Sequence, residues 1–226
     1  MNGWWVSDVL QSPHGPVILV SWTVVVIGSI VLHELSHGWA AIRLGDQTPR
    51  LAGHMTWNPL VHMGSWSLVA FAVMGIAWGA MPVDPTRLRG KYADALVAVA
   101  GPAMNILIAL VSFVLLVLWA GFAAHLGVAD PLLTNLHLFL RIAVWLNVVL
   151  ALFNMLPIYS PMIVLDGGHI AANIFPGFRR FAETEHGGWI MLGVFILFFW
   201  FGFDWIMDAA TTLIETLASG ALSLFG

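Results

Sequence analysis

Long apolar runs that almost no charge interrupts dominate this chain. Its eight Lys and Arg residues and twelve Asp and Glu residues make up 9% of the 226 positions, whereas 60% are apolar and mean hydropathy is +0.90. A soluble domain carries about 25% charged residues, so this chain has too little polar side chain to coat a water-facing globule. The composition excludes a cytosolic enzyme, a disordered chain and a nucleic-acid binder, and it predicts one membrane-embedded domain over residues 1–226.

Four runs are the candidate membrane spans, since a helix needs about 20 apolar residues to cross the hydrocarbon. They cover residues 17–41, 95–124, 142–156 with a start near 136, and 188–203. We expect an all-α polytopic membrane protein with about four to five transmembrane helices. Its core should cover about 17–174, with a C-terminal helix or helices within 187–225. Asp204, Asp208 and Glu215 recur at near-helical spacing, which predicts that 205–225 form a helix that lies on the membrane surface or contacts a partner.

The apolar segment 65–81 is short, and Gly64, Gly75 and Gly79 border or interrupt it. It either crosses the membrane or forms a re-entrant or short β-containing segment before the span that contains Ala-Gly-Pro. Re-entry would leave seven of the eight basic residues on one side and only Arg141 on the other, whereas a full crossing divides them five to three. Because basic residues favour the cytoplasmic side, this asymmetry favours re-entry and a first span whose second half lies near the cytoplasm.

Three ionisable residues, His33, Glu34 and His37, lie inside the first apolar run. Each costs about 2.5 to 3.5 kcal/mol on insertion scales, so such residues indicate function. His33 and His37 share a helix face and can present two imidazoles to one metal ion, while Glu34 lies about 100° round the helix, within reach of a metal-bound water. The spacing is typical of zinc hydrolases. The alternative is a polar patch of two core histidines and a glutamate between helices.

Asp166 is the candidate third ligand. The chain has no cysteine, so nitrogen and oxygen must hold any metal, and a catalytic zinc takes three protein ligands. Asp166 follows a span, helix-breaking prolines precede it, and Gly167 and Gly168 after it allow close backbone approach. Alternatively Asp166 caps a helix over 167–174, which would not exclude ligation.

Three motifs occur in order within apolar surroundings, over about residues 31–174. They are His-Glu-Leu-Ser-His at 33–37, Val-Ala-Gly-Pro-Ala-Met-Asn at 99–105, and Asn-Met-Leu-Pro at 154–157 leading to Leu-Asp-Gly-Gly at 165–168. Together they resemble the site-2 protease family of intramembrane zinc metalloproteases. Further short motifs, such as Asn-Pro-Leu at 58–60 and Pro-Val-Asp-Pro at 82–85, resemble its compact bacterial branch, which lacks a PDZ or CBS domain. One departure is that Pro157 precedes Asp166 by nine residues instead of about five.

The resemblance implies that His33, His37 and Asp166 hold one Zn²⁺ per chain and that Glu34 is the general base. It implies hydrolysis of peptide bonds within or near transmembrane helices of membrane-protein substrates, as in regulated intramembrane proteolysis. We expect a multi-pass protein of the cytoplasmic (inner) cell membrane, in contact with the lipid bilayer, with its active site nearer the cytoplasmic side. No nucleic-acid partner is expected.

Other polar residues are candidates for substrate contact. Asn105 and Asn154 could donate hydrogen bonds to an oxyanion or an extended substrate, or could simply join helices. The resemblance suggests a role for His62 near the site. His54 and His169 are candidate ligands or ordinary interfacial residues. The stretches 50–55 and 80–84 are candidate edges for an extended substrate.

Two other functions stay open. A metal transporter or channel would pass an ion through His33, Glu34, His37 and Asp166, and it predicts polar residues along a path across the bilayer. A proteolytically inactive family member would act as a membrane scaffold.

Overall fold

A computed structural model describes residues 4–123 and 127–222, and this part of the chain is mostly helical. The elements follow in the order α1 (Trp5–Leu10), α2 (Gly15–Arg43), α3 (Thr48–Leu51), α4 (Pro59–Met74), η1 (Pro85–Arg87), α5 (Ala93–Phe122), α6 (Asp130–Asn154), α7 (Asp166–Ile174), α8 (Pro176–Ala182), α9 (Glu185–Phe201) and α10 (Phe203–Leu222). The described residues form no β-strand and only one isolated antiparallel bridge, between Tyr159 and Val164. The all-α expectation is confirmed, and the chain between α2 and α5 contains no strand.

Three helices, α2, α5 and α6, are long and apolar enough to cross a membrane. They correspond to the first three predicted spans, although residue 124, the predicted end of the second, lies outside the described residues. Helix α6 begins earlier than predicted because Pro131 starts it at the first turn. Arg141 does not interrupt this helix, since its side chain is half exposed and faces Glu215.

The fourth predicted span has a different form. Helices α8 and α9 qualify together, but they meet at a bend of 92°. Helix α9 alone has 17 residues, and at about 1.5 Å per residue it falls short of a hydrocarbon core about 30 Å thick. The described chain thus has three candidate spans, which is fewer than the four to five expected, or four if the bent pair counts as one span.

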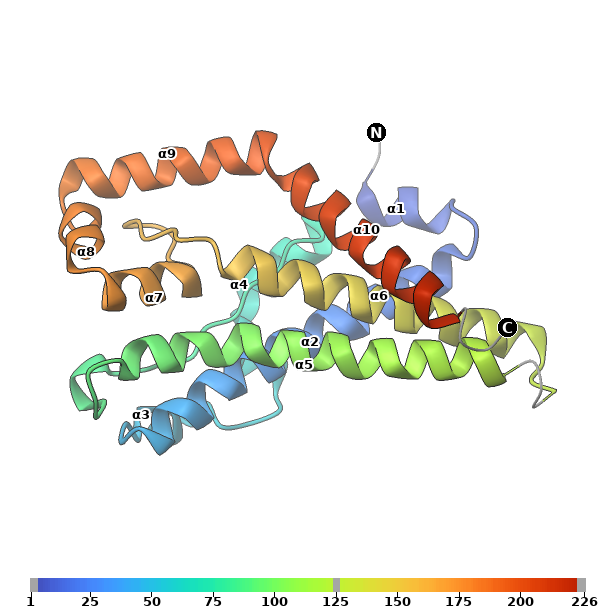
Figure 1. The fold of residues 1–226 in the computed structure, drawn as a ribbon, viewed down its shortest axis with the longest axis horizontal. Helices are drawn as coiled ribbons and strands as arrows, with labels where there is room; N and C mark the ends of the chain where they lie inside the picture. The colour runs from blue at the N-terminus through green and yellow to red at the C-terminus, as the bar shows by residue number, and fades with distance from the viewer. Residues whose placement is uncertain (1–3, 124–126, 223–226) are drawn as a thin grey trace.

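The three long helices form the core of the molecule. Helices α5 and α6 lie side by side along the long axis and α2 crosses behind them, packed against both (Figure 1). Val25, Val26 and Ile30 of α2 meet Met63 and Phe71 of α4 and two residues of α6 in one apolar cluster. The candidate functional site lies where these helices touch.

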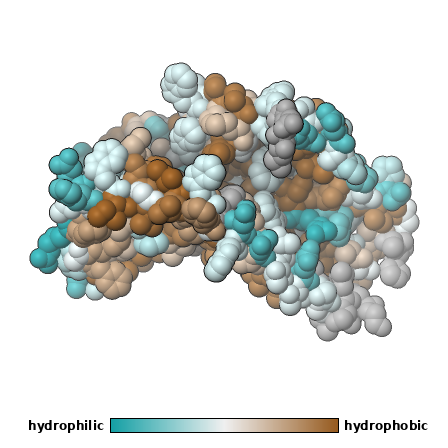
Figure 2. Space-filling view, turned by 90° about the horizontal axis from the view of Figure 1, so that it is seen from above, coloured by the Kyte–Doolittle hydropathy of each residue, from teal (hydrophilic) through white to brown (hydrophobic). Residues whose placement is uncertain are grey.

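Much of the outer surface is apolar. Helix α5 exposes Ile106, Leu110 and Val114, and α9 exposes Ile190, Leu197 and other large apolar side chains. In Figure 2 hydrophobic residues cover much of the face shown. Hydrophilic residues gather at the left end, where α8 lies in Figure 1, and in a second group in the right half. Such a surface suits a lipid environment, because a water-facing protein rarely exposes contiguous apolar patches of this extent.

The ambiguous segment 65–81 reverses direction instead of continuing. Helix α4 ends at Gly75, whose positive φ of 76° turns the chain back. The returning residues 76–84, here called the return segment, run beside α4: Ser67 Oγ binds both the N–H (2.8 Å) and the C=O (2.7 Å) of Trp78. The N–H of Ala80 donates to the carbonyl of His62 at 2.9 Å. This hairpin has the shape of a re-entrant segment.

Helix α10 packs on the helical core of its own chain. It lies across α6 and α5, with Ile214 in an apolar cluster with Leu116, Leu140 and Val144. Trp145 Nε1 donates to Thr211 Oγ1 at 3.0 Å. The apolar side of this amphipathic helix is therefore covered at least in part by α6, which the pattern of acidic residues did not reveal.

Candidate metal centre

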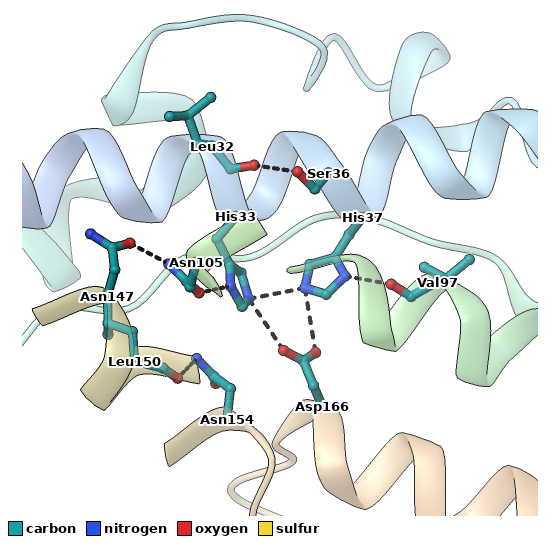
Figure 3. Close-up of polar contacts among 10 residues, drawn as sticks. All are labelled: Leu32, His33, Ser36, His37, Val97, Asn105, Asn147, Leu150, Asn154 and Asp166. Carbon is teal, nitrogen blue, oxygen red and sulfur yellow. Dashed lines mark hydrogen bonds and ion pairs between the residues drawn. The ribbon is translucent and has the colours of Figure 1, made fainter. Parts of the chain in front are cut away.

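Helix α2 carries both histidines of the predicted metal site on one face. Their Nε2 atoms lie 3.0 Å apart (Figure 3). His37 Nδ1 lies 2.8 Å from the backbone carbonyl of Val97, which can only accept a hydrogen bond. Nδ1 of His37 therefore carries the proton, and Nε2 presents a lone pair toward His33. Both rings are held in a buried position between α2 and α5.

Asp166 completes the group from α7. Its carboxylate oxygens lie 3.2 Å from His33 Nε2 and 3.4 Å from His37 Nε2. One ligand atom from each of the three residues, here called the metal triad, lies within 4.8 Å of the others. Within the described chain Asp166 Oδ2 is buried and accepts no hydrogen bond. Lone pairs that converge in this way, with two nitrogens and a carboxylate, match the donor set of a catalytic zinc site.

A glycine on α5 leaves room for the metal triad. A Cβ built on Gly101 would lie 2.6 Å from His33 Nε2, and it would collide with His37 Nε2 as well. Any side chain at this position would occupy the space onto which the two imidazoles converge. Gly101 is the central residue of the Ala-Gly-Pro motif. The need for space beside the two imidazoles therefore explains why this position of the motif is a glycine.

Glu34 lies beside the metal triad and faces the return segment. Its side chain is buried, and a Cβ on Gly79 would lie 2.6 Å from Glu34 Oε1. The triad and Glu34 line a cavity of about 340 Å³. Residues of the return segment, including Gly79 and Met81, form one wall, and Asn154, Asp94 and His169 also line it. A peptide that entered this cavity would meet Glu34 and the metal triad together.

The extra residues between Pro157 and Asp166 fold back on themselves. Residues 158–165, here called the fold-back loop, are closed by a hydrogen bond of 3.0 Å from the N–H of Leu165 to the carbonyl of Ile158. Gly167 then packs on the backbone of Met155 and Leu156, and Gly168 on that of Ile158, so closely that neither has room for a Cβ. The longer spacing does not displace Asp166, because the loop returns the chain to the end of α6. Asp166 is the first residue of α7, and Leu165 is the cap of this helix. The alternative in which Asp166 itself caps a helix over 167–174 is therefore off by one position.

The other predicted residues lie in different places. Asn105 is fully buried, accepts from His33 Nδ1 at 2.7 Å and donates to Asn147 at 2.9 Å, so its side chain contacts a proposed ligand and a second helix and not the cavity. Asn154 lines the cavity and donates to its own helix at Leu150. His62 is buried and lies 2.7 Å from the carbonyl of Thr56 through Nε2.

Two more histidines lie outside the metal triad. The His54 ring stacks edge-on against His62, with ring centroids 6.3 Å apart. The His169 side chain lies at the cavity, 3.8 Å from the carboxylate of Asp94.

Asp46, after the end of α2, anchors the far end of the return segment. Its buried carboxylate accepts from the N–H (2.9 Å) and hydroxyl (2.5 Å) of Thr48 and from the N–H of Asp84 (2.8 Å). Burial opposes ionisation, but these hydrogen bonds outweigh it and lower the pKa of Asp46. Asp84 in turn accepts from Thr86, which lowers its own pKa.

Sequence reasoning did not assign Asn147, Gly79 or Asp46 a role in or near the site. Asn147 is a polar residue in the middle of an apolar run, which was a usable signal of a buried contact. Gly79 packs against Glu34, and Asp46 binds the backbone of Asp84, only because the return segment passes close to α2. No local sequence pattern indicates that contact between distant segments.

Known proteins resemble this chain over most of its length. Residues 21–200 match Peptidase family M50. A protein of Bacillus subtilis named "Putative zinc metalloprotease YwhC" is 34% identical over 190 residues, which are 81% of this chain and 82% of the relative. "Putative zinc metalloprotease Rip2" of Mycolicibacterium smegmatis is 27% identical over 186 residues, 75% of this chain and 63% of the relative. No solved structure matches. The chain therefore belongs to peptidase family M50, the site-2 protease family that its motifs resemble, and is a zinc metalloprotease with apolar, membrane-type helices.

Proposed function

We propose that this protein is an intramembrane protease, which hydrolyses peptide bonds within or near transmembrane helices of other membrane proteins, as in regulated intramembrane proteolysis. One observation carries the proposal. The metal triad and Glu34 line a single cavity between helices that are apolar enough for a membrane. Ionisable groups at such a place are costly unless they serve a function.

In this proposal His33, His37 and Asp166 would hold a zinc ion through two imidazole nitrogens and a carboxylate. When bound, zinc lowers the pKa of a water molecule to about 7 and polarises a carbonyl oxygen. The Glu34 carboxylate takes a proton from the water molecule whose oxygen bonds to the peptide carbonyl carbon. It returns that proton to the amide nitrogen as the C–N bond breaks and the amine leaves. Gly79 packs against Glu34 and limits where its carboxylate can move.

The substrate must reach the cavity as an extended peptide, because a helix keeps its carbonyl groups in hydrogen bonds. The return segment forms one wall of the cavity in a non-helical conformation. We propose that the substrate lies along residues 80–84, where backbone groups can pair with it as in strand addition. Helix-breaking residues in the substrate would then promote cleavage.

We further propose that the active site lies nearer the cytoplasm, in the cell membrane. Helices α3 and α8 and the start of α5 lie at one end of the molecule (Figure 1). Most of the basic residues belong to these elements or flank them: Arg43, Arg50, Arg87, Arg89, Lys91, Arg179 and Arg180. The positive-inside tendency assigns that end to the cytoplasm. His33 and His37 belong to the half of α2 that approaches it.

One control variant and a measurement of zinc flux into vesicles separate proteolysis from the alternatives. The protein, purified with zinc, is incubated with single-span membrane peptides in vesicles, in parallel with Glu34→Gln. We expect one zinc per chain in both proteins and a loss of cleavage of at least about a hundredfold in the variant. Equal cleavage by both would reject Glu34 as the base. No cleavage by the wild type of any peptide, with zinc bound, would favour the scaffold, and zinc flux into vesicles would favour the transporter.

A further inference from the structure

A chain of buried hydrogen bonds connects His33 with two other helices. His33 Nδ1 lies 2.7 Å from Asn105 Oδ1 on α5, and Asn105 Nδ2 donates to Asn147 Oδ1 on α6 at 2.9 Å (Figure 3). Asn147 Nδ2 donates to Ser29 Oγ, back on α2, also at 2.9 Å. Both asparagines have an exposed fraction of 0%. We call this series from His33 to Ser29 the relay.

The direction of the relay is set at its far end. Asn147 Nδ2 also donates, at 2.9 Å, to the backbone carbonyl of Ala143, which can only accept. The amide of Asn147 therefore turns its oxygen toward Asn105, and Asn105 must present its NH₂ group there. The oxygen of Asn105 then faces His33, whose Nδ1 must carry the proton. This leaves Nε2 of His33 as the unprotonated nitrogen, on the side of His37 and Asp166.

We propose that Asn147 is a positioning residue for the metal site. Acting through Asn105, and with Ser29 as its second acceptor, it fixes the tautomer and ring orientation of His33. The inference rests on the proposed function, because it takes His33 to be a zinc ligand. Outer partners of metal-bound histidines commonly change metal affinity by 10- to 100-fold when removed. Here the first partner of His33 is Asn105, and the orientation of the Asn105 amide depends in turn on Asn147.

An interhelical role alone makes a different prediction. Buried asparagines also join membrane helices, and losing such a contact lowers stability. It would not change the ligand field of a metal in protein that stays folded. Metal affinity and the visible spectrum of a bound Co²⁺ ion therefore distinguish positioning from simple helix association, and neither requires a substrate.

The test compares Asn147→Ala and Ser29→Ala with the matched control Ser21→Ala. Ser21 and Ser29 are both buried serines of α2, about two turns apart, and Ser21 lies outside the relay. Zinc affinity is measured by competition with a chelator on monodisperse, folded protein, and Co²⁺ spectra are recorded at saturating metal. We expect zinc binding to weaken by about tenfold for Asn147→Ala and about threefold for Ser29→Ala, with an altered Co²⁺ spectrum, and no change for Ser21→Ala.

The outcomes separate this inference from the proposed function. If His33→Ala loses zinc binding while Asn147→Ala and Ser29→Ala keep wild-type affinity and spectrum, the relay does not position His33, and the assignment of the ligands stands. If Asn147→Ala does not fold, the nearly isosteric Asn147→Leu, which also removes both the oxygen and the NH₂ group, decides in its place. If His33→Ala binds zinc as the wild type does, His33 is not a ligand, and both proposals fall.

Discussion

The two sides of the metal site are built in different ways. On one side, His33, Glu34 and His37 come from five consecutive positions of a single 29-residue helix. On the other, Asp166 comes from the start of α7, and Gly101 and Gly79 from two further segments. Helix geometry alone places the first group, whereas the second depends on how distant parts of the chain pack.

This difference shows where the site is vulnerable. The helical side is fixed by about 1.5 Å of rise and 100° of rotation per residue, and its neighbours cannot easily change that. The opposite side reaches the site only because glycines allow backbones and side chains to approach closely. Substitutions that leave all proposed ligands in place should therefore still disable the site, and their effects should differ with the segment that is disturbed.

The largest effect is expected for Gly101→Ala. The added methyl group would lie 2.6 Å from His33 Nε2 and would also strike His37 Nε2, so it disturbs both imidazoles at once. We expect zinc affinity, measured by chelator competition, to fall by at least about a hundredfold, with loss of peptide cleavage at physiological zinc.

Gly28→Ala is the matched control for Gly101→Ala. Gly28 lies on the helix of the two histidines, and a Cβ there would meet nothing within 4 Å. Since Ala favours a helix over Gly by up to about 1 kcal/mol, this variant should bind zinc normally and unfold no more readily. Zinc affinity in Gly101→Ala equal to that in Gly28→Ala would show that the steric argument is wrong.

A smaller effect is expected from Gly168→Ala, which disturbs the same packed side but does not touch the two histidines. The new Cβ would collide with the carbonyl oxygen of Ile158 and would approach Tyr159 Cβ to 3.3 Å. The start of α7 must shift, and Asp166 with it, while both histidines stay in place. We expect chelator competition to show zinc affinity about thirtyfold weaker.

Gly177→Ala, on the neighbouring helix α8, controls for that substitution, because a Cβ there would meet nothing within 4 Å. It should bind zinc as the wild type does. Tight zinc binding in Gly168→Ala would mean that α7 tolerates the shift, or that Asp166 contributes little to binding.

The helical side of the site could be predicted from the sequence. The spacing of His33 and His37 is a property of one helix, and apolar surroundings made the ionisable residues conspicuous. Asp166 was identified from the prolines and glycines around it, and the structure brings it to the two histidines. The three long helices were predicted because each is a nearly uninterrupted apolar run.

The packed side could not be predicted in the same way. That Asn105 pairs with Asn147, and that Gly79 covers Glu34, depends on the depth at which helices cross. The fold-back loop was visible only as extra length between Pro157 and Asp166. The packing of α10 on α6 could not be predicted either, because an amphipathic pattern indicates that a helix has an apolar side but not which element covers it.

A substitution in the return segment can displace Glu34, the proposed base, while it leaves the metal triad in place. In Gly79→Ala the methyl group would lie 2.6 Å from Glu34 Oε1 and 2.8 Å from Ile30 Cγ2. We expect peptide cleavage to slow about tenfold, because the carboxylate is displaced, while zinc affinity stays within about twofold. The zinc affinity of Gly28→Ala gives the reference. A joint fall in zinc affinity and cleavage would show that the return segment supports the triad as well as Glu34.

The smallest effect is expected at Asp46, which anchors the return segment from outside the long helices. Asp46→Asn keeps one acceptor but loses the charge that strengthens the hydrogen bonds from Thr48 and Asp84, so thermal unfolding should show a loss of about 1 kcal/mol near pH 7. The folded-state pKa of Asp46 lies below its unfolded value of about 3.9. Its stabilisation is therefore complete above about pH 4 and disappears as the pH falls through the folded value, so the gap between Asp46→Asn and wild type should close in acid. The difference in unfolding free energy could instead stay constant down to pH values at which Asp46 of the wild type is protonated. Asp46 would then stabilise the protein through packing, and its charge would not hold the return segment to the end of α2.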